Sequence, residues 1–251
     1  MEGSKVSVPM PLRSLLVSAV LALGSLPGLA GAQVEGVVLP FRQVDVSAPV
    51  SSRVVDMKVK EGDAVKEGQP LAQLYGKLEE LEMQRAKALL ERREFEAKGA
   101  KRLFDNKIIP EAKALESRID LDLARMQFET AQEQVRLRTI LAPMDGVVVE
   151  RLKEVGEAVL SAQPIFRILD LSKVYVQCSV SPEALARFVP GQKVQVRIPQ
   201  MEGAPSFPGE VTLVDPCANG GGRFRVKVLV NNPEHRIRAG LRATVETTGS
   251  R

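Results

Sequence analysis

The chain contains a single histidine, His235, two cysteines and no tryptophan. One histidine excludes metal sites built from several imidazoles and argues against catalysis by a histidine base. Aromatic residues make up only 4% of the chain, and the formal net charge is only +4 over 251 residues. A charge excess this small gives no electrostatic basis for binding nucleic acid. Histidine-cluster metal sites are thus excluded and histidine-based catalysis is disfavoured. From the sequence as a whole we expect no catalytic, metal or cofactor site and no nucleic-acid partner.

The first 32 residues form an expected export signal. Lys5 and Arg13 precede an apolar run from Leu15 to Leu26, and Ala30-Gly31-Ala32 supplies small residues before a cleavage point. This order is typical of a secretory signal peptide, with cleavage after Ala32. The run of about a dozen residues is shorter than the roughly 20 that span a bilayer. We therefore expect a periplasmic protein, with an uncleaved inner-membrane anchor as the alternative.

Valine is absent from a long internal block. The chain has 32 valines, and none lies among the 69 residues between Val65 and Val135. β-Branched residues favour strands, whereas Ala, Leu, Glu, Lys and Arg favour helices. Residues 77–138 are rich in these helix formers, with Gly99 and Pro110 as their only glycine and proline. The pattern predicts mainly β structure with one long helical insertion.

Pro110 divides the insertion into two expected helices, about 78–105 and 111–138, because proline is tolerated in the first turn of a helix but not in its interior. Narrow apolar stripes at 3/4 spacing favour an antiparallel two-helix coiled coil. The stripe of the first helix comprises Met83, Ala86, Leu90, Ala97, Ala100 and Phe104. The stripe of the second comprises Ala112, Ile119, Leu123, Met126, Thr130 and Leu137. We expect these side chains to pack the helices against each other.

The far end of this hairpin carries two adjacent apolar residues, Ile108 and Ile109. They either cap the coiled coil or form a docking surface, since exposed apolar groups on a projection commonly mark contacts. Each helix would be roughly 42 Å long at about 1.5 Å per residue. A hairpin of that length adds little to the core of a small β body, and its length favours a role in reaching a partner.

A gapless internal repeat flanks the helical insertion. Residues 48–74 align with residues 142–168 at a constant offset of 94, and nine of 27 positions are identical. Gly62 and its equivalent Gly156 suit turns that need a positive φ. One copy alone buries too little apolar area, so we expect the two copies to pack together as a small sandwich.

Alternating valines return after Leu171. About six strands, with a short helix from Pro182 to Phe188, predict a small β-barrel in this last third of the chain. Cys178 lies in register with the core valines of one strand. It could pair with Cys217 in an oxidising compartment, or remain free as a small hydrophobic residue. Both alternatives remain open from the sequence.

Taken together, these segments resemble the periplasmic adaptor subunits of bacterial efflux pumps, the membrane fusion protein (HlyD-type) family. The resemblance rests on VSAPVSSRVVDMKVKEGDAVKEGQPLAQL (46–74), RTILAPMDGVVVERLKEVGEAV (138–159), the Val189-Pro190-Gly191-Gln192 turn and RIRAGLRATVE (236–246). It implies a biotinyl/lipoyl-like barrel-sandwich hybrid interrupted by an antiparallel coiled coil and followed by a small β-barrel. The implied domains are a signal peptide (1–32), two lipoyl-like halves (33–76 and 139–170), the α-helical hairpin (77–138) and the barrel (171–251).

The resemblance also implies partners: an inner-membrane transporter, a TolC-like outer-membrane channel and further copies of the same chain. The expected partner-binding residues at the hairpin tip are Leu103, Asn106, Lys107, Ile108, Ile109 and Pro110. Many adaptors of resistance-nodulation-division pumps carry Arg, Leu and Ser spaced across this tip. Here Leu103 is retained, whereas Gly99 and Pro110 stand at the Arg and Ser positions. The sequence ends at Arg251, just past the barrel, so transporter contact is expected to use the barrel or a different arrangement of partners.

A biotinyl or lipoyl carrier domain serving an enzyme complex is the alternative function. Such carriers present a modifiable lysine at the tight turn between the two halves. Here the helical insertion opens that turn, and Lys77 is the nearest remnant, while Met57-Lys58-Val59 lies inside the first half. No nucleophile–histidine–acid arrangement surrounds His235. The residues give no indication of a transported substrate.

Overall fold

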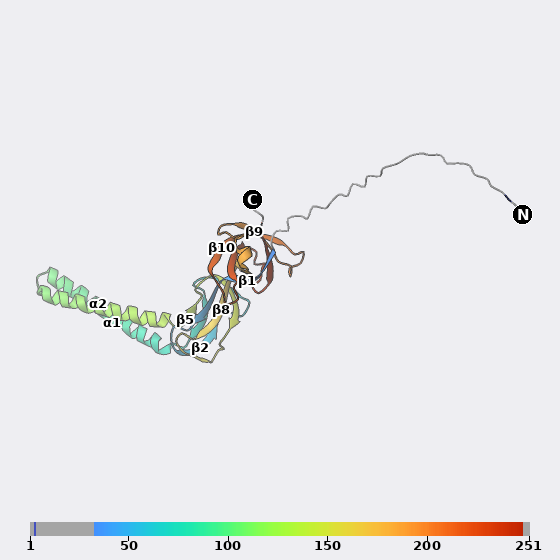
Figure 1. Cartoon of the computed structure of the whole chain (residues 1–251). Coiled ribbons are helices and arrows are strands. Elements are labelled where there is room, and N and C mark those ends of the chain that lie inside the picture. The colour runs from blue at the N-terminus through green and yellow to red at the C-terminus, as the bar shows by residue number, and fades with distance from the viewer. Residues whose placement is uncertain (1–2, 4–32, 248–251) are drawn as a thin grey trace. The chain divides into compact units, whose positions relative to one another are not determined.

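The computed structural model describes Gly3 and residues 33–247, so the expected export signal, apart from Gly3, lies outside the described residues. Two β modules and a helical hairpin are visible in Figure 1. The elements are β1 (Gln33–Ser47), β2 (Ser52–Met57), β3 (Ala64–Val65), β4 (Pro70–Leu74), α1 (Lys77–Asp105), α2 (Glu111–Arg136), β5 (Thr139–Leu141), β6 (Gly146–Arg151), β7 (Ala158–Val159), β8 (Pro164–Val180), α3 (Pro182–Leu185), β9 (Lys193–Arg197), β10 (Ser206–Ala218), β11 (Phe224–Asn231) and β12 (Arg242–Glu246). No helix in the described part is long and apolar enough to cross a membrane.

The first β module is a sandwich made by the two repeat copies. One sheet has the strand order β5-β4-β2-β7, and the other is formed by β3 and β6 together with parts of β8 and β1. Gly62 N–H donates to the Val148 carbonyl at 2.8 Å, and Gly156 N–H donates to the Val54 carbonyl at 2.8 Å. The two bonds join equivalent positions, because Gly62 corresponds to Gly156 and Val148 corresponds to Val54 in the repeat. The expected packing of the repeat copies into one sandwich is therefore confirmed.

The turns of the sandwich explain why the repeat keeps its glycines. Gly62 and Gly156 have φ values of 91° and 95°, in the left-handed region where a Cβ is disfavoured. Gly68 also has a positive φ of 78°, and its equivalent, Ala162, keeps the same conformation at 65°. The turn geometry is thus preserved even where the second copy has lost the glycine.

The second β module is a closed six-stranded barrel. Its strand order is β1-β12-β9-β10-β11-β8, and a β1–β8 pairing closes the ring. Residues after 171 supply only five of these strands, because the sixth comes from the start of β1, where Gln33 lies opposite Glu246. The expectation of about six strands from residues 171–251 alone is therefore corrected. The start of β1 completes the barrel by pairing with β12 and β8, whose edges would otherwise have unpaired backbone groups.

The two β modules have separate apolar cores but share two strands. The sandwich core includes Val54, Leu71 and Phe166, all fully buried, whereas the barrel core includes Val176 and Val228. β1 and β8 pair antiparallel from Gly36 opposite Cys178 to Ser47 opposite Pro164, with irregular register between Pro40 and Arg42. The same pair of strands thus contributes to both cores.

The cysteines are free thiols in different surroundings. Cys178 is buried in the barrel core, and Cys217 is exposed. Burial raises the pKa of the Cys178 thiol to about 12. Of the two alternatives left open by the sequence, the structure therefore shows the free-thiol form, with Cys178 packed as a small hydrophobic residue.

The hairpin helices begin and end close to their expected limits, with α1 over Lys77–Asp105 and α2 over Glu111–Arg136. The expected stripe of α1 largely faces α2: Ala86 is buried, and Met83, Leu90, Ala97 and Ala100 are half-buried. Phe104, at its distal end, is exposed. The predicted seam of α1 is thus confirmed up to its last turn.

The expected stripe of α2 is wrong. Ile119, Leu123 and Met126 are 51%, 53% and 60% exposed, and they point away from α1. The residues of α2 that are buried or half-buried toward α1 are Ala114, Ser117, Asp120, Leu121, Ala124, Phe128, Ala131 and Val135. α2 carries two apolar stripes, and the one rich in alanine allows the two helices to approach closely. Choosing between the two stripes by side-chain size alone therefore predicted the wrong face of α2.

Candidate partner-binding site at the hairpin tip

The expected partner-binding residues lie together at the turn between α1 and α2. Lys107 N–H donates to the Phe104 carbonyl and Ile108 N–H to the Leu103 carbonyl, both at 2.8 Å. This pair of bonds is a Schellman motif, which satisfies carbonyls at the end of a helix. Lys107 occupies its left-handed position, with φ of 60°. The tip is therefore a defined turn closed by backbone hydrogen bonds.

α2 starts directly after this turn. Pro110 is the N-cap residue, with φ of −69° and ψ of 154°, and its carbonyl accepts the N–H of Lys113 at 3.0 Å. Proline suits the entry to a helix, because the first N–H groups have no partner within the helix. The reversal of chain direction thus occupies only the residues between Asp105 and Glu111.

The two isoleucines at the tip differ in exposure. The Ile108 side chain is 65% exposed, whereas Ile109 is half-buried. Leu103 is exposed, as are Asn106, Lys107 and Pro110. Ile108 and Leu103 therefore offer apolar surface at the end of the hairpin. The binding of a partner by these six residues stays a prediction.

A shallow groove of about 720 Å³ lies beside the tip, between the last turns of α1 and the first turns of α2. Its apolar lining includes Phe104, Leu115 and Leu121, and its charged rim includes Lys101 and Arg118. Leu115 was absent from the sequence-based set of site residues. Its spacing of four residues from Ile119 is the signal that could have revealed it, since residues four apart share a helix face.

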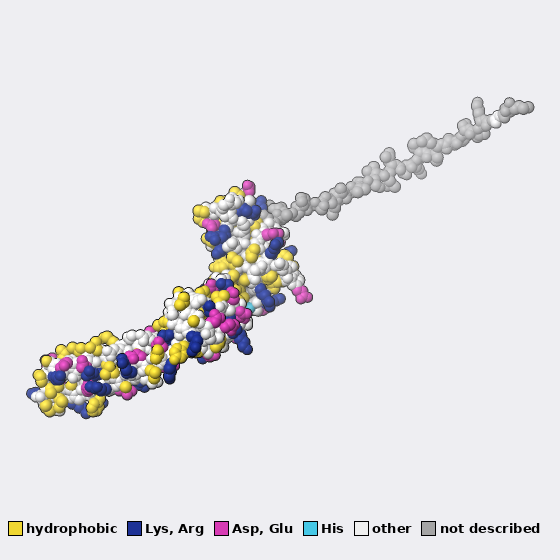
Figure 2. Space-filling view, turned by 90° about the horizontal axis from the view of Figure 1, so that it is seen from below, with side chains coloured by type: hydrophobic (Ala, Val, Ile, Leu, Met, Phe, Trp, Pro, Cys, Tyr) yellow, Lys and Arg dark blue, Asp and Glu magenta, His cyan; other side chains and the backbone are white. Residues whose placement is uncertain are grey.

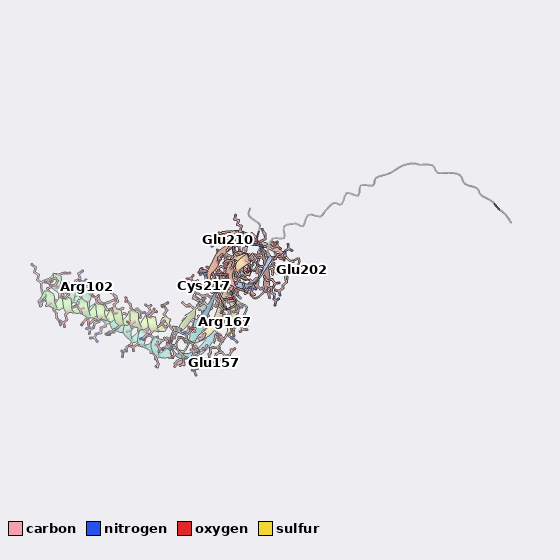
Figure 3. The ribbon with its side chains drawn as sticks, viewed as in Figure 1. Arg102, Glu157, Arg167, Glu202, Glu210 and Cys217 are labelled. Atoms are coloured by element: carbon pink, nitrogen blue, oxygen red, sulfur yellow. The ribbon has the colours of Figure 1, made fainter. Side chains whose placement is uncertain are left out.

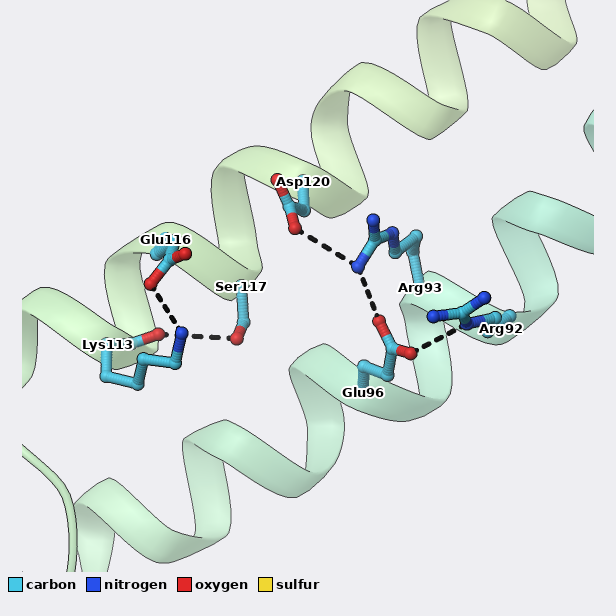
Figure 4. Close-up of polar contacts among 7 residues, drawn as sticks. All are labelled: Arg92, Arg93, Glu96, Lys113, Glu116, Ser117 and Asp120. Carbon is cyan, nitrogen blue, oxygen red and sulfur yellow. Dashed lines mark hydrogen bonds and ion pairs between the residues drawn. The ribbon is translucent and has the colours of Figure 1, made fainter.

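Figure 4 shows polar contacts in the distal half of the hairpin, of which the Arg93–Asp120 ion pair joins the two helices. Arg93 Nη1 lies 2.7 Å from Glu96 on its own helix and 3.1 Å from Asp120 on α2. Hydrogen bonds from Arg92 and Arg93 hold the pKa of the Glu96 carboxyl below its ordinary value. Because Arg93 contacts carboxylates on both helices, it links α1 to α2 at this level of the hairpin.

Lys77, the nearest remnant of a carrier lysine, does not lie at a tight turn. It is the first residue of α1, and its Nζ lies 3.5 Å from Glu80 on the same helix. The preceding Tyr75 carbonyl accepts a hydrogen bond from the Ser52 hydroxyl at 2.9 Å. The junction between the sandwich halves is thus occupied by the base of the hairpin.

Several charged residues of the β modules form structural ion pairs. Arg167 of β8 donates to Asp45 of β1 at 2.7 Å and to Glu150 of β6 at 2.6 Å, which ties three strands of one sheet together. The hydrogen bond from Arg167 lowers the pKa of the Asp45 carboxyl. Figure 3 shows Arg167 in the β region, away from Arg102 at the distal end of the hairpin. Among the described residues, no group of three or more His, Cys, Asp or Glu side chains is placed to hold a metal ion.

Two family models match the chain. The model described as the RND MFP barrel-sandwich hybrid domain matches residues 42–171, and the model described as the CusB-like β-barrel domain matches residues 173–251. Among solved structures, a MacA-MexA chimeric protein containing the Pseudomonas aeruginosa MexA α-hairpin has a TM-score of 0.76 at 23% identity, covering 87% of this chain and 81% of that one. The membrane fusion protein Spr0693 of Streptococcus pneumoniae has a TM-score of 0.69 at 18% identity, covering 88% and 100%. These likenesses show the fold.

The chain matches a smaller share of the length of its curated relatives. The nodulation protein NolF of Rhizobium meliloti is 24% identical over 224 residues, 83% of this chain and 61% of NolF. The cobalt-zinc-cadmium resistance protein CzcB of Cupriavidus metallidurans is 27% identical over 163 residues, 60% of this chain and 31% of CzcB. A UPF0194 membrane protein of Acidithiobacillus ferridurans is 29% identical over 145 residues, 50% of this chain and 43% of the relative. The chain thus spans less than two thirds of the length of each.

Proposed function

The chain belongs to the RND membrane fusion protein (MFP) family, and on that premise we propose that it is a periplasmic adaptor of an efflux pump. In this role it is exported by its first 32 residues, carries out no reaction itself, and bridges an inner-membrane transporter and an outer-membrane channel as a homo-oligomer. The match of the barrel-sandwich hybrid model to residues 42–171 is the observation that carries this proposal.

The hairpin supports the proposed bridging role. α1 has 29 residues, which corresponds to a helix of about 43 Å at about 1.5 Å per residue. Its two helices pack on each other and leave Ile108 and Leu103 exposed at the far end. From Lys98 to Arg118 the chain carries six basic and three acidic residues. The tip therefore suits a partner surface with an apolar patch and acidic surroundings.

A photocrosslinking residue at position 108 tests the docking of the tip. We expect crosslinks from this position to an outer-membrane channel in intact envelopes. A residue introduced at Leu160 is the matched control, because Leu160 is 69% exposed but lies in a turn of the sandwich. Equal capture of the channel from both positions, or capture from neither, would contradict docking by the tip.

Purification of the chain from crosslinked envelopes tests the adaptor role as a whole. We expect an inner-membrane transporter to copurify with the chain. Ile108→Asp should lose the outer-membrane channel but keep the transporter, because a charge at an apolar contact costs desolvation without a partner. Recovery of neither membrane component with the unmodified chain would refute the proposed function.

A further inference from the structure

The ladder between β1 and β8 stops before the end of the barrel. Its last pair is Gly36 opposite Cys178. Beyond that pair, β1 continues to Gln33 along β12 only, and β8 continues to Val180 along β11 only. A strand that is paired on one side presents alternate N–H and C=O groups on its other side. The two strands therefore separate into a wedge, and their facing edges take part in no ladder among the described strands.

A cleft of about 760 Å³ lies at this wedge, with lining residues from β1, β8, β10, β11 and β12. The strands approach closely at its floor, since a Cβ on Gly36 would lie only 2.7 Å from the Cys178 sulfur. The end of β10 and the turn that follows it form a side wall, with Asp215, Cys217 and Asn219 in the lining. Volumes of about 300–1,000 Å³ are typical of sites for small ligands.

Arg223 already covers one backbone group at the wedge. Its Nε and Nη2 atoms donate to the Ser179 carbonyl at 3.2 and 2.6 Å. Ser179 is the first residue of β8 beyond the pairing with β1. The guanidinium thus acts where the N–H of a neighbouring strand would otherwise donate, and its Nη1 hydrogens remain for another acceptor. An extended chain that enters the wedge meets both a strand edge and this donor.

Three charged groups of the cleft take part in no ion pair among the described residues: Arg223, Arg242 and Glu35. Arg225 differs from them, because its Nε and Nη2 donate to Asp215 Oδ2 at 3.1 and 2.8 Å. On the barrel face that Figure 2 shows, charged side chains of both signs are mixed with apolar ones. That face therefore carries no broad field of one sign, and local groups of charges decide what binds.

The positions of Glu35 and Arg242 set the length of a matching ligand. Glu35 lies opposite Thr244, and Arg242 lies opposite Val37, so Glu35 and Arg242 are diagonal neighbours on β1 and β12. Diagonal positions are about 7–8 Å apart. Both side chains are exposed and line the cleft without pairing. An extended peptide of two or three residues spans about 7–10 Å, at about 3.3 Å per residue, and carries an ammonium at one end and a carboxylate at the other.

We propose that this wedge cleft binds a short peptide of two or three residues whose two ends are both free. Arg242 and Arg223 hold the peptide carboxylate, which guanidinium groups match in geometry and charge. Glu35 pairs with the peptide ammonium. The extended backbone runs along the open edges of β1 and β8, in the way that strand edges bind peptides by main-chain hydrogen bonds. This site goes beyond the adaptor role and needs no membrane partner.

Titration calorimetry of the full chain with trialanine tests the proposal. The comparison probes are N-acetyl-trialanine, which lacks the ammonium, and trialanine amide, which lacks the carboxylate. We expect trialanine to bind and each blocked probe to bind at least about tenfold more weakly, because each loses one charged hydrogen-bonding end. Trialanine should also slow the alkylation of Cys217 by iodoacetamide, because this exposed thiol lines the cleft.

Two variants assign the ends of the peptide. Glu35→Gln should bind trialanine and N-acetyl-trialanine alike while still rejecting the amide. Arg242→Gln should show the reverse, with a reduced preference for trialanine over its amide and an unchanged rejection of the acetylated probe. Arg238→Gln is the matched control, because Arg238 is exposed but lies outside the cleft lining. Circular dichroism verifies that each variant is folded, so a change in probe preference reports the cleft itself.

Several results would overturn the inference. These are no binding of trialanine at millimolar concentration, equal binding of all three probes, or binding that leaves the alkylation of Cys217 unchanged. Protection of Cys217 by sodium acetate as effectively as by trialanine would show a site for simple anions instead. Unchanged probe preferences in both Glu35→Gln and Arg242→Gln would place the peptide elsewhere. None of these measurements involves a transporter or a channel, so the adaptor role is judged separately.

Discussion

Arg138, which follows α2, and Glu79, in the first turn of α1, form an ion pair of 2.6 Å at the base of the hairpin. The two side chains are only 16% and 22% exposed, unlike the other ion pairs of the hairpin. Arg138 also donates to the Tyr75 carbonyl at 3.4 Å, and its own carbonyl accepts the Leu74 N–H at 2.7 Å. One residue therefore connects the return of the hairpin to the strand that leads into it.

We expect Glu79→Gln to destabilise the chain by about 1.5–3 kcal/mol, because it leaves a shielded guanidinium without its carboxylate. Denaturant unfolding followed by circular dichroism measures this loss. Glu82→Gln is the matched control, since the Glu82–Arg85 pair is exposed, and its loss should cost about 0.5 kcal/mol or less. Equal losses of stability in the two variants would contradict a special role for the Glu79–Arg138 ion pair at the base of the hairpin.

Lys107→Gly should stabilise the chain by about 1 kcal/mol. Lys107 holds a left-handed conformation at the tip, which costs a residue with a Cβ about that much and costs glycine nothing. Lys101→Gly provides the control, because Lys101 lies in the interior of α1, where glycine should destabilise by about 1 kcal/mol. The free energies of unfolding of the two variants should thus change in opposite directions. A lower free energy of unfolding for Lys107→Gly would contradict the left-handed conformation of Lys107 at the tip.

Gly146→Ala should destabilise the sandwich by about 1–3 kcal/mol. A Cβ at this position would lie 2.5 Å from the Leu169 carbonyl oxygen and 2.8 Å from Ile168 Cγ2, so β6 and β8 would have to separate. At Gly220, a Cβ meets nothing within 4 Å, and alanine there should be close to neutral. Thermal unfolding of both variants measures the difference, and a neutral Gly146→Ala would argue against the close approach of these strands.

The two thiols should differ sharply in reactivity. Burial raises the pKa of Cys178 to about 12, so at pH 8 its reactive thiolate is scarcely populated. Cys217 is exposed. We expect iodoacetamide at pH 8 to label Cys217 alone in the folded chain and both cysteines after unfolding. Mass spectrometry counts the labels, and fast labelling of both residues in the folded chain would contradict the packing of Cys178 in the barrel core.

The sequence predicted those parts of the fold that leave a local or repeated pattern. The offset of 94 revealed the sandwich, and Pro110 located the tip. The sixth strand of the barrel could not be predicted in this way, because the pairing of Gln33 with Glu246 joins the two ends of the described chain. Long-range pairing of that kind leaves no periodic signal in either segment.

The face of α2 was predicted wrongly for a physical reason. Ile119 and Ala124 belong to stripes with the same helical spacing, and hydrophobicity favours the larger side chains. Which stripe faces α1 depends on the distance between the helices, which small residues shorten. The tip turn was located correctly, but Leu115 and the groove beside it depend on the rotation of α2 and were missed.

The long strands β1 and β8 also have a mechanical consequence. They are paired antiparallel through both β modules, so two covalent chains and the hydrogen bonds between them connect the barrel to the sandwich. The register is irregular between Val46 and Ser47, at the end of the ladder, and is interrupted within its length between Pro40 and Arg42. Torsion between the barrel and the sandwich would concentrate at that interruption, while the paired segments on either side keep their length.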